Sequence, residues 1–176
     1  TFKNRIFGAP MSNPELDPDC HMRKEDLAFH ENRARGGLAT VAIGLGIVDP
    51  VGRVHTKEVT LYDVMSLPSL KEYANAMHRH NCIAVMELAH GGKYAGARSH
   101  DGAGDPLVLG PNNETNPDGL RVTSMTDEDI ERVADCYADA AVLCQKAGID
   151  MVLVHGGHGW LLGQFMSPTM NHRTDK

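Results

Sequence analysis

The chain has 176 residues, with 17 basic and 23 acidic side chains and a formal net charge of −6. This length allows one domain with a sizeable core. Both signs of charge are scattered along the chain, which argues against nucleic acid or an anionic membrane surface as the main partner. No apolar run has the length of a membrane-spanning helix, and the first residues do not have the pattern of a signal peptide.

The cysteines indicate a reducing compartment. They are widely separated, and their spacing fits neither a zinc ribbon nor an iron–sulfur pattern. We therefore expect reduced thiols in a cytoplasmic protein. A homo-oligomer is compatible with this composition. The four residues are Cys20, Cys82, Cys136 and Cys144.

Strands and helices are predicted to alternate along the chain. Short apolar runs predict buried strands, and the longer segments between them have helical periodicity. Thr126 and Asp129 form a capping-box pattern, while Gly36 and Gly148 stand where helices should stop. The predicted strands are 6–11, 38–45, 83–88 and 151–154, and the predicted helices are 23–35, 67–80 and 127–147.

This order predicts a parallel sheet with right-handed crossovers. No G-x-G-x-x-G follows a strand, so a β/α barrel is favoured over a dinucleotide-binding fold. A complete barrel takes about 250 residues and eight strands. We therefore expect residues 1–176 to be the amino-terminal half of a TIM (β/α)8 barrel, with about four β/α units and incomplete at the carboxyl end. A half-barrel that pairs with a second copy is the alternative.

The carboxyl ends of the predicted strands carry the candidate functional residues. Active sites of parallel α/β proteins lie at this edge. The last strand runs into H-G-G-H at residues 155–158, and the third ends with Glu87 followed by H-G-G at residues 90–92. Small residues there would let a flat ligand approach the backbone. The long Gly-, Asn- and Pro-rich segment 89–125 is expected to lie over the same barrel mouth.

Three segments carry a specific resemblance. They read N-R-I-F-G-A-P-M at 4–11, M-E-L-A-H-G-G-K-Y-A at 86–95, and H-G-G-H-G-W-L-L-G-Q-F at 155–165 with N-x-R-T-D behind it. The chain resembles the old yellow enzyme family, closest to the branch with 2,4-dienoyl-CoA reductase, 2-enoate reductases and bile-acid oxidoreductases. The resemblance implies a barrel that holds FMN and transfers hydride from NAD(P)H through the flavin to an activated C=C bond.

The resemblance also assigns residues to the flavin site. The first strand would form a floor beside the flavin, and Ser12 would tune its electron affinity. Gly44 would pack against the ring system. Glu87 falls where many members carry Gln, and a carboxylate can accept from a flavin N–H but does not donate unless it is protonated. The assigned residues are Ala9, Pro10, Met11, Ser12, Gly44 and Glu87.

The catalytic assignments fall on the last segment. His155 and His158 match the pair that holds the electron-withdrawing group of the substrate and stabilises its developing negative charge. Trp160 stands where many relatives have a proton-donating Tyr, and an indole N–H is not a useful acid. Tyr94 and His90 are replacement acids by position only. Trp160 would otherwise shape the pocket.

Two other function classes stay open at this stage. One is a metal-dependent barrel hydrolase that uses His155 and His158 with a carboxylate such as Glu87, although no clear third ligand is seen. The other is an inactive barrel fragment. The leading hypothesis predicts a small unsaturated substrate, such as an enoate, enoyl thioester, enone or steroid-like enone. It assigns no metal site to this chain, and it expects a 4Fe-4S cluster and FAD only in a longer parent protein.

Overall fold

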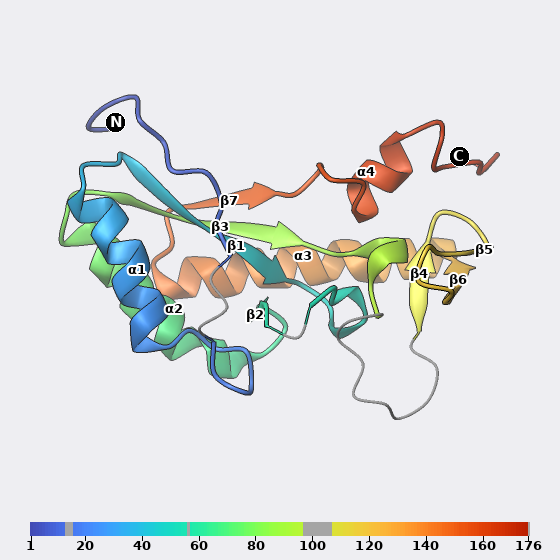
Figure 1. Ribbon diagram of the computed structural model, residues 1–176, viewed down its shortest axis with the longest axis horizontal. Coiled ribbons are helices and arrows are strands. Elements are labelled where there is room, and N and C mark those ends of the chain that lie inside the picture. The colour runs from blue at the N-terminus through green and yellow to red at the C-terminus, as the bar shows by residue number, and fades with distance from the viewer. Residues whose placement is uncertain (13–15, 56, 97–106, 176) are drawn as a thin grey trace.

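The computed structural model describes residues 1–12, 16–55, 57–96 and 107–175 (Figure 1). Its helices are α1 Lys24–Arg35, α2 Leu67–His78, α3 Asp127–Ala147 and α4 Leu161–Met166. Its strands are β1 Thr40–Ile47, β2 Val59–Thr60, β3 Ile83–Ala89, β4 Val108–Gly110, β5 Glu114–Thr115, β6 Arg121–Ser124 and β7 Met151–Val154. Short 3-10 helices η1 Pro50–Gly52, η2 Val64–Ser66 and η3 Gly92–Tyr94 lie in the connections.

The main sheet is parallel throughout, with the strand order β2-β1-β3-β7. β3 lies between β1 and β7, and Val85 of β3 pairs with Ala42 on one side and with Met151 on the other. The register between β1 and β3 shifts between Ile43 and Gly46. The parallel arrangement confirms the prediction from the strand and helix order.

The prediction of a strand at residues 6–11 is wrong, because this segment does not form a regular strand. This segment makes only two isolated bridges to β1, from Phe7 to Thr40 and from Met11 to Ile43. Pro10 has no N–H to give to a ladder, which interrupts the pairing. The segment shares one edge of β1 with β2, a two-residue strand that the sequence did not predict.

The three long helices begin and end close to the predicted places. Thr126 and Asp129 form the complete capping box of α3, and Gly148 ends that helix with a left-handed φ of 83°. α2 ends at His78, two residues before the predicted end, and β1 is shifted toward the carboxyl end relative to the predicted 38–45. Such differences of a few residues are usual at element ends.

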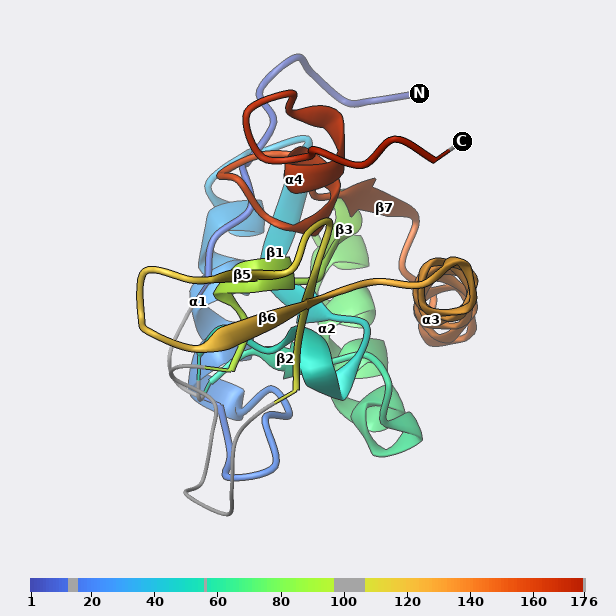
Figure 2. The same ribbon diagram turned by 90° about the vertical axis from the view of Figure 1, so that its right-hand side faces the viewer.

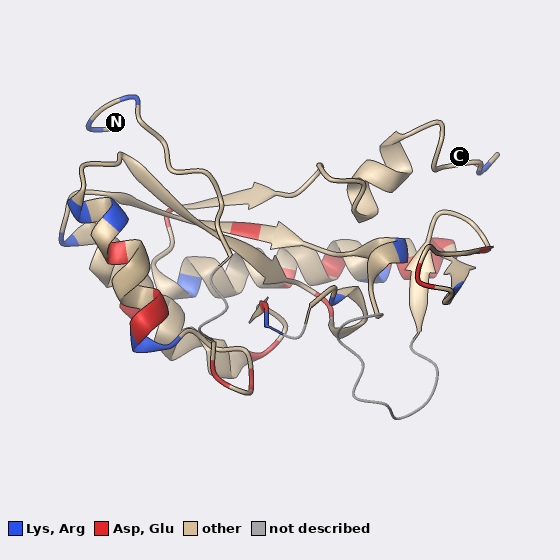
Figure 3. Cartoon of the chain, in the orientation of Figure 1, with Lys and Arg blue, Asp and Glu red and all other residues tan. Residues whose placement is uncertain are grey.

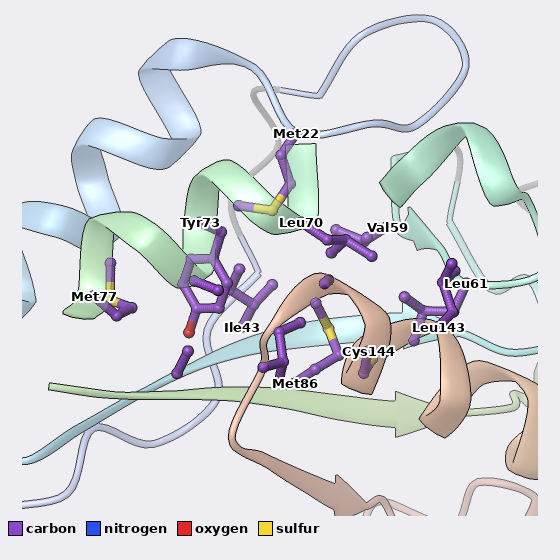
Figure 4. Close-up of a cluster of buried hydrophobic side chains, with 14 of the residues drawn as sticks. Met22, Ile43, Val59, Leu61, Leu70, Tyr73, Met77, Met86, Leu143 and Cys144 are labelled. Atoms are coloured by element: carbon purple, nitrogen blue, oxygen red, sulfur yellow. The ribbon is translucent and has the colours of Figure 1, made fainter. Parts of the chain in front are cut away.

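The hydrophobic core lies between the main sheet and the helices (Figure 4). Alternate strand residues, such as Val41 and Ile43 of β1 and Met86 of β3, point toward the helices. Tyr73 of α2 reaches into this layer, where its hydroxyl donates to the carbonyl oxygen of Val41 at 2.6 Å. α1, α2 and α3 follow one another around this face of the sheet (Figure 2).

The carboxyl ends of β1, β3 and β7 point to the same end of the molecule, where the small sheet and α4 lie (Figure 1). The small sheet has the order β4-β6-β5. It lies within the segment 89–125, which was predicted as a long loop over the barrel mouth. The position is confirmed for the described residues of this segment, but much of it is folded; residues 97–106 lie outside the described part.

β7 leaves its apolar side chains accessible on both faces. Met151 to Val154 are 37% to 57% exposed, and no strand of the described residues pairs with the outer edge of β7. Within the described residues, no helix is long and apolar enough to cross a membrane.

Candidate active site

Glu87 is the one charged residue of β3, and its neighbours in the strand are apolar. Figure 3 shows this acidic position as a red band on β3. Met86 and Leu88 belong to the core on the helix side, so the alternation of a strand directs Glu87 to the opposite face. Glu87 is 9% exposed. A buried carboxylate needs compensating partners, which makes the contacts of Glu87 the starting point of the site.

Glu87, His155 and His158 form a hydrogen-bonded chain. Glu87 Oε1 lies 2.8 Å from His155 Nδ1, and His155 Nε2 lies 3.2 Å from His158 Nδ1. The two imidazoles stack with ring planes 17° apart. The chain runs from a buried carboxylate to an exposed imidazole, and both ring nitrogens of His155 are engaged.

The turn after β7 positions the two histidines and Trp160. The backbone N–H of His155 continues the pairing of β7 by donating to the Leu88 carbonyl at 2.9 Å. His158 has a positive φ of 56°, between two glycines that leave room for the turn. Trp160 precedes α4, and its ring meets the His155 ring edge-on at 5.1 Å. The indole therefore flanks the histidine pair.

The predicted flavin floor lies beside Glu87. A Cβ built at Gly44 would fall 2.4 Å from Glu87 Oε2 and 2.9 Å from Pro10 Cβ, so these three residues are in close contact. Met11 is 44% exposed and accepts a backbone hydrogen bond from Gly44 N–H at 3.2 Å. Ser12 follows Met11 and is exposed. The structure thus brings Pro10, Met11, Gly44 and Glu87 together at one edge.

Ala9 and the two replacement acids lie in different surroundings. The Ala9 carbonyl accepts from Arg33 Nη2 at 2.9 Å, which joins the floor segment to α1. The Tyr94 ring lies 3.6 Å from the Cβ position of Gly159, so it is next to the histidine turn. His90 is fully buried and is not part of this site.

His90 belongs to a network beneath the mouth. Its Nδ1 accepts from Gly92 N–H at 3.0 Å, and its Nε2 lies 3.7 Å from Asp49 Oδ2. Asp49 also forms an ion pair of 2.5 Å with Arg132 of α3. Burial opposes ionisation of Asp49, but His90, Arg132 and the Val51 N–H hold its pKa at about 2. The network joins the loops after β1 and β3 to α3, so we assign His90 a structural role.

Gln164 is a residue whose role the sequence did not reveal. It is fully buried in α4. Its Nε2 donates to the carbonyls of Gly91 and Gly159, and its Oε1 accepts from Lys93 N–H. One side chain thus joins the loops that follow β3 and β7. A polar residue within the apolar sequence L-L-G-Q-F-M was the available signal for this role.

The arrangement does not resemble a metal centre. Glu87, His155 and His158 bind one another in a line, so their donor atoms do not converge on a common point. Among the residues that the structure describes, no three His, Cys, Asp or Glu side chains are grouped as metal ligands. The metal-dependent hydrolase is therefore not favoured.

Solved structures with a closely similar fold include TIM-barrel old yellow enzymes. Old yellow enzyme from Pichia sp. AKU4542 superposes with a TM-score of 0.89 at 27% identity, over 99% of this chain and 48% of that chain. A 2-naphthoyl-CoA reductase superposes with a TM-score of 0.91 over 99% of this chain and 28% of that chain. At 24% identity, this second likeness concerns the fold alone. The chain therefore has the fold of about half a TIM barrel, as predicted.

The sequence comparisons show the family. A profile of the NADH:flavin oxidoreductase / NADH oxidase family matches residues 1–176. NADPH dehydrogenase from Halalkalibacterium halodurans is 30% identical over 176 residues, which are 99% of this chain and 50% of the relative. A 4,4'-dithiodibutanoate disulfide reductase from Rhodococcus erythropolis is also 30% identical, over 42% of its length. The chain belongs to the NADH:flavin oxidoreductase / NADH oxidase family, and it spans about half the length of the curated relatives it matches.

Proposed function

We propose that the complete protein reduces an activated carbon–carbon double bond with hydride that passes from NAD(P)H through bound FMN. The observation that carries this proposal is the Glu87–His155–His158 chain, which lies beside Gly44 and Pro10 at the carboxyl edge of the sheet. Family membership supports a flavin and a nicotinamide as the redox partners. The substrate class is an enoate, enoyl thioester, enone or steroid-like enone.

The residues present fit a flat, largely apolar group. Met11 offers an exposed apolar side chain, Gly44 has no side chain, and Ser12 adds an exposed hydroxyl. In the turn after β7, a Cβ at Gly157 would meet only His155 within 4 Å among the described residues, so the backbone is open to them there. When bound, FMN would supply the hydride chemistry, while the protein supplies orientation and electrostatics.

In this proposal, His155 and His158 bind the carbonyl or carboxylate oxygen of the substrate. Their rings stack and present Nε2 of His155 and Nδ1 of His158 to each other at 3.2 Å. A substrate oxygen bound by both rings would replace this mutual hydrogen bond. Donors aimed at an oxygen that gains negative charge stabilise the transition state more than the ground state.

The proton for the substrate carbon needs another source than Trp160. An indole N–H is a hydrogen-bond donor and not a useful acid. Trp160 contacts His155 edge-on, so we assign it to shaping the pocket. Tyr94, whose ring lies beside Gly159, stays the candidate proton donor.

The first test is the cofactor content of the complete gene product. Flavin released by denaturation is identified by absorbance and mass, and metals are measured in the same sample. We expect FMN near stoichiometry and flavin reduction by NADH or NADPH. The reduced flavin is then mixed with enoates, enoyl thioesters, enones and a disulfide in turn. The compound class that reoxidises the flavin identifies the substrate class. A stoichiometric metal with no flavin would contradict the proposal.

The second test is the substitution His155→Ala. We expect kcat/KM to fall on the order of 10²-fold or more, because one of the two imidazoles that hold the substrate oxygen is lost. Flavin content should change little. His78→Ala is the matched control, since His78 lies on α2 and pairs with Asp150 at the surface. Unchanged turnover in His155→Ala would remove His155 from the substrate-binding role.

A further inference from the structure

Glu87 has a protein partner that a purely flavin-binding role does not require. Its Oε1 lies 2.8 Å from His155 Nδ1, and the two side chains are only 11% and 9% exposed. We infer that Glu87 is a positioning residue, which fixes the ring orientation and tautomer of His155 and through it the orientation of His158. The consequence for catalysis rests on the proposed function; the tautomer itself does not.

The direction of each hydrogen bond follows from the chemistry of the groups. An ionised carboxylate only accepts, so the proton between Glu87 and His155 resides on Nδ1 of the imidazole. In the neutral ring, Nε2 of His155 is then an acceptor. The contact of 3.2 Å to His158 requires His158 to donate from its Nδ1. Glu87 therefore sets the proton positions on both His155 and His158.

This arrangement decides what a substrate oxygen would meet. When the oxygen replaces His155 as the partner of His158, the Nδ1–H of His158 becomes its donor. Nε2 of His155 faces the same place and donates only after it takes up one further proton. The Nδ1–H bond to Glu87 can persist in both states. A buried carboxylate that holds a catalytic imidazole in one tautomer has the same role in hydrolase triads.

The local fold keeps the carboxylate of Glu87 in this place. Glu87 lies on β3, and β3 pairs with β1 on one side and with β7 on the other. Gly44 of β1 makes room for the second carboxylate oxygen, because a Cβ there would lie 2.4 Å from Oε2. His155 is fixed at the end of β7 by its backbone bond to Leu88. Both members of the pair are thus held by adjacent strands.

The test is the tautomer of His155, measured by ring-¹⁵N NMR on the histidine-labelled complete gene product without substrate. The signals are assigned by comparison with His155→Gln. We expect a protonated Nδ1 and an unprotonated Nε2 in the unmodified protein. Glu87→Leu should shift the tautomer toward protonated Nε2, while Glu87→Gln should preserve Nδ1–H because its amide oxygen still accepts. A protonated Nε2 with a bare Nδ1 in the neutral ring of the unmodified protein would overturn the inference, whether or not a variant folds.

Activity and cofactor content provide the second readout. We expect Glu87→Leu to lower kcat/KM on the order of tenfold or more, because His155 loses the carboxylate that stabilises its doubly protonated form, the form that donates from Nε2. Glu87→Gln should lower kcat/KM less, and the variants are compared at equal flavin content. Glu114→Leu is the matched control, because Glu114 pairs with Lys93 at 3.3 Å and takes no part in the hydrogen bonds that link Glu87, His155 and His158. A tautomer in Glu87→Leu equal to that of the unmodified protein would also refute the positioning role. Protonated Nδ1 in a protein without flavin would instead refute the proposed function alone.

Discussion

His158 combines a proposed substrate-binding role with an unusual backbone conformation. Its φ of 56° lies in the left-handed region, and Gly159 behind it has a φ of 69°. Residues other than glycine pay about 1–2 kcal/mol for this region, and Asn tolerates it better than most. Such conformations cluster at functional sites, where the surrounding structure over-determines them. The turn that presents the second imidazole is therefore built at a local cost.

This cost gives a prediction for two substitutions. His158→Asn should keep the free energy of unfolding close to that of the unmodified protein, whereas His158→Val should lower it by about 1–2 kcal/mol, because a branched Cβ opposes positive φ. Urea unfolding of the complete gene product measures both values. Both variants remove the imidazole, so they serve as each other's control. Equal stability of the two variants would contradict the strained-turn interpretation.

The role of Glu87 was only partly predictable from the sequence. A carboxylate within a buried strand indicated a need for a partner. The resemblance to the old yellow enzyme family directed attention to the flavin. His155 follows Glu87 by 68 positions, and only the pairing of β3 with β7 places the two side chains 2.8 Å apart. The predicted flavin contact of Glu87 stays a prediction.

At the level of the elements, α4 is joined to two loops by Gln164. Its three hydrogen bonds reach Gly91, Gly159 and the backbone of Lys93. A Cβ at Gly92 would lie 2.4 Å from Gln164 Oε1, so the packing there is tight. The loop after β3 and the turn after β7 therefore keep their relative position through one amide.

We predict that Gln164→Leu lowers the free energy of unfolding by about 3 kcal/mol, because two carbonyls and one N–H lose their buried partner. Hydrogen exchange should accelerate at Lys93 N–H, which donates to Gln164. Gln145→Leu on the exposed side of α3 is the control and should change little. Unaltered exchange at Lys93 in Gln164→Leu would show that Gln164 does not hold this loop.

The helices were more predictable than the connections between strands. Thr126 and Gly148 mark the ends of α3 by local chemistry, and the structure confirms both. β4, β5 and β6 lie in a segment without clear periodicity, and two of them have only two or three residues. Such short strands depend on pairing partners and not on local propensity. The sequence therefore predicted the position of this segment over the carboxyl edge of the sheet, but it did not predict the strands within it.

In the molecule as a whole, a few buried titratable groups link folding to pH. Glu58 is nearly fully buried, and its Oε1 has no hydrogen-bond partner among the described residues. Burial raises the pKa of Glu58 to about 7, although backbone N–H groups of His55 and Val54 oppose the shift. Burial and the charge of Arg33 lower the pKa of His30 to about 3. The two groups affect stability in opposite directions at mildly acidic pH.

A difference measurement isolates the contribution of Glu58. Its folded pKa is above its unfolded value, so its stabilising effect is complete below about pH 4.5 and is lost as the pH rises through about 7. The Gln side chain of Glu58→Gln does not ionise. As the pH rises from about 4.5 to about 7, the free energy of unfolding of Glu58→Gln should therefore increase by on the order of 3 kcal/mol relative to that of the unmodified protein. Urea unfolding at several pH values measures this. A difference that does not vary with pH would contradict a buried, neutral Glu58. Since His30 is present in both proteins, its contribution cancels.

The parallel α/β architecture was determined by the sequence itself. Apolar runs, helical periodicity and terminal glycines are local signals, and they act independently of the rest of the molecule. The H-G-G-H turn after the last strand was likewise apparent from the sequence. The family comparison supports the half-barrel interpretation that followed from these signals.

Only the tertiary structure decided which side chains meet. Strand pairing and helix packing bring together side chains that are distant in the sequence. Examples are Glu87 with His155, Asp49 with Arg132, and Gln164 with the loops that follow β3 and β7. The loss of regular pairing at Pro10 and the folded segment before α3 also depend on neighbours in space. Local sequence patterns specify elements because hydrogen bonds and hydrophobic periodicity are short-range. The chemistry of the candidate site depends on long-range contacts, which those patterns do not encode.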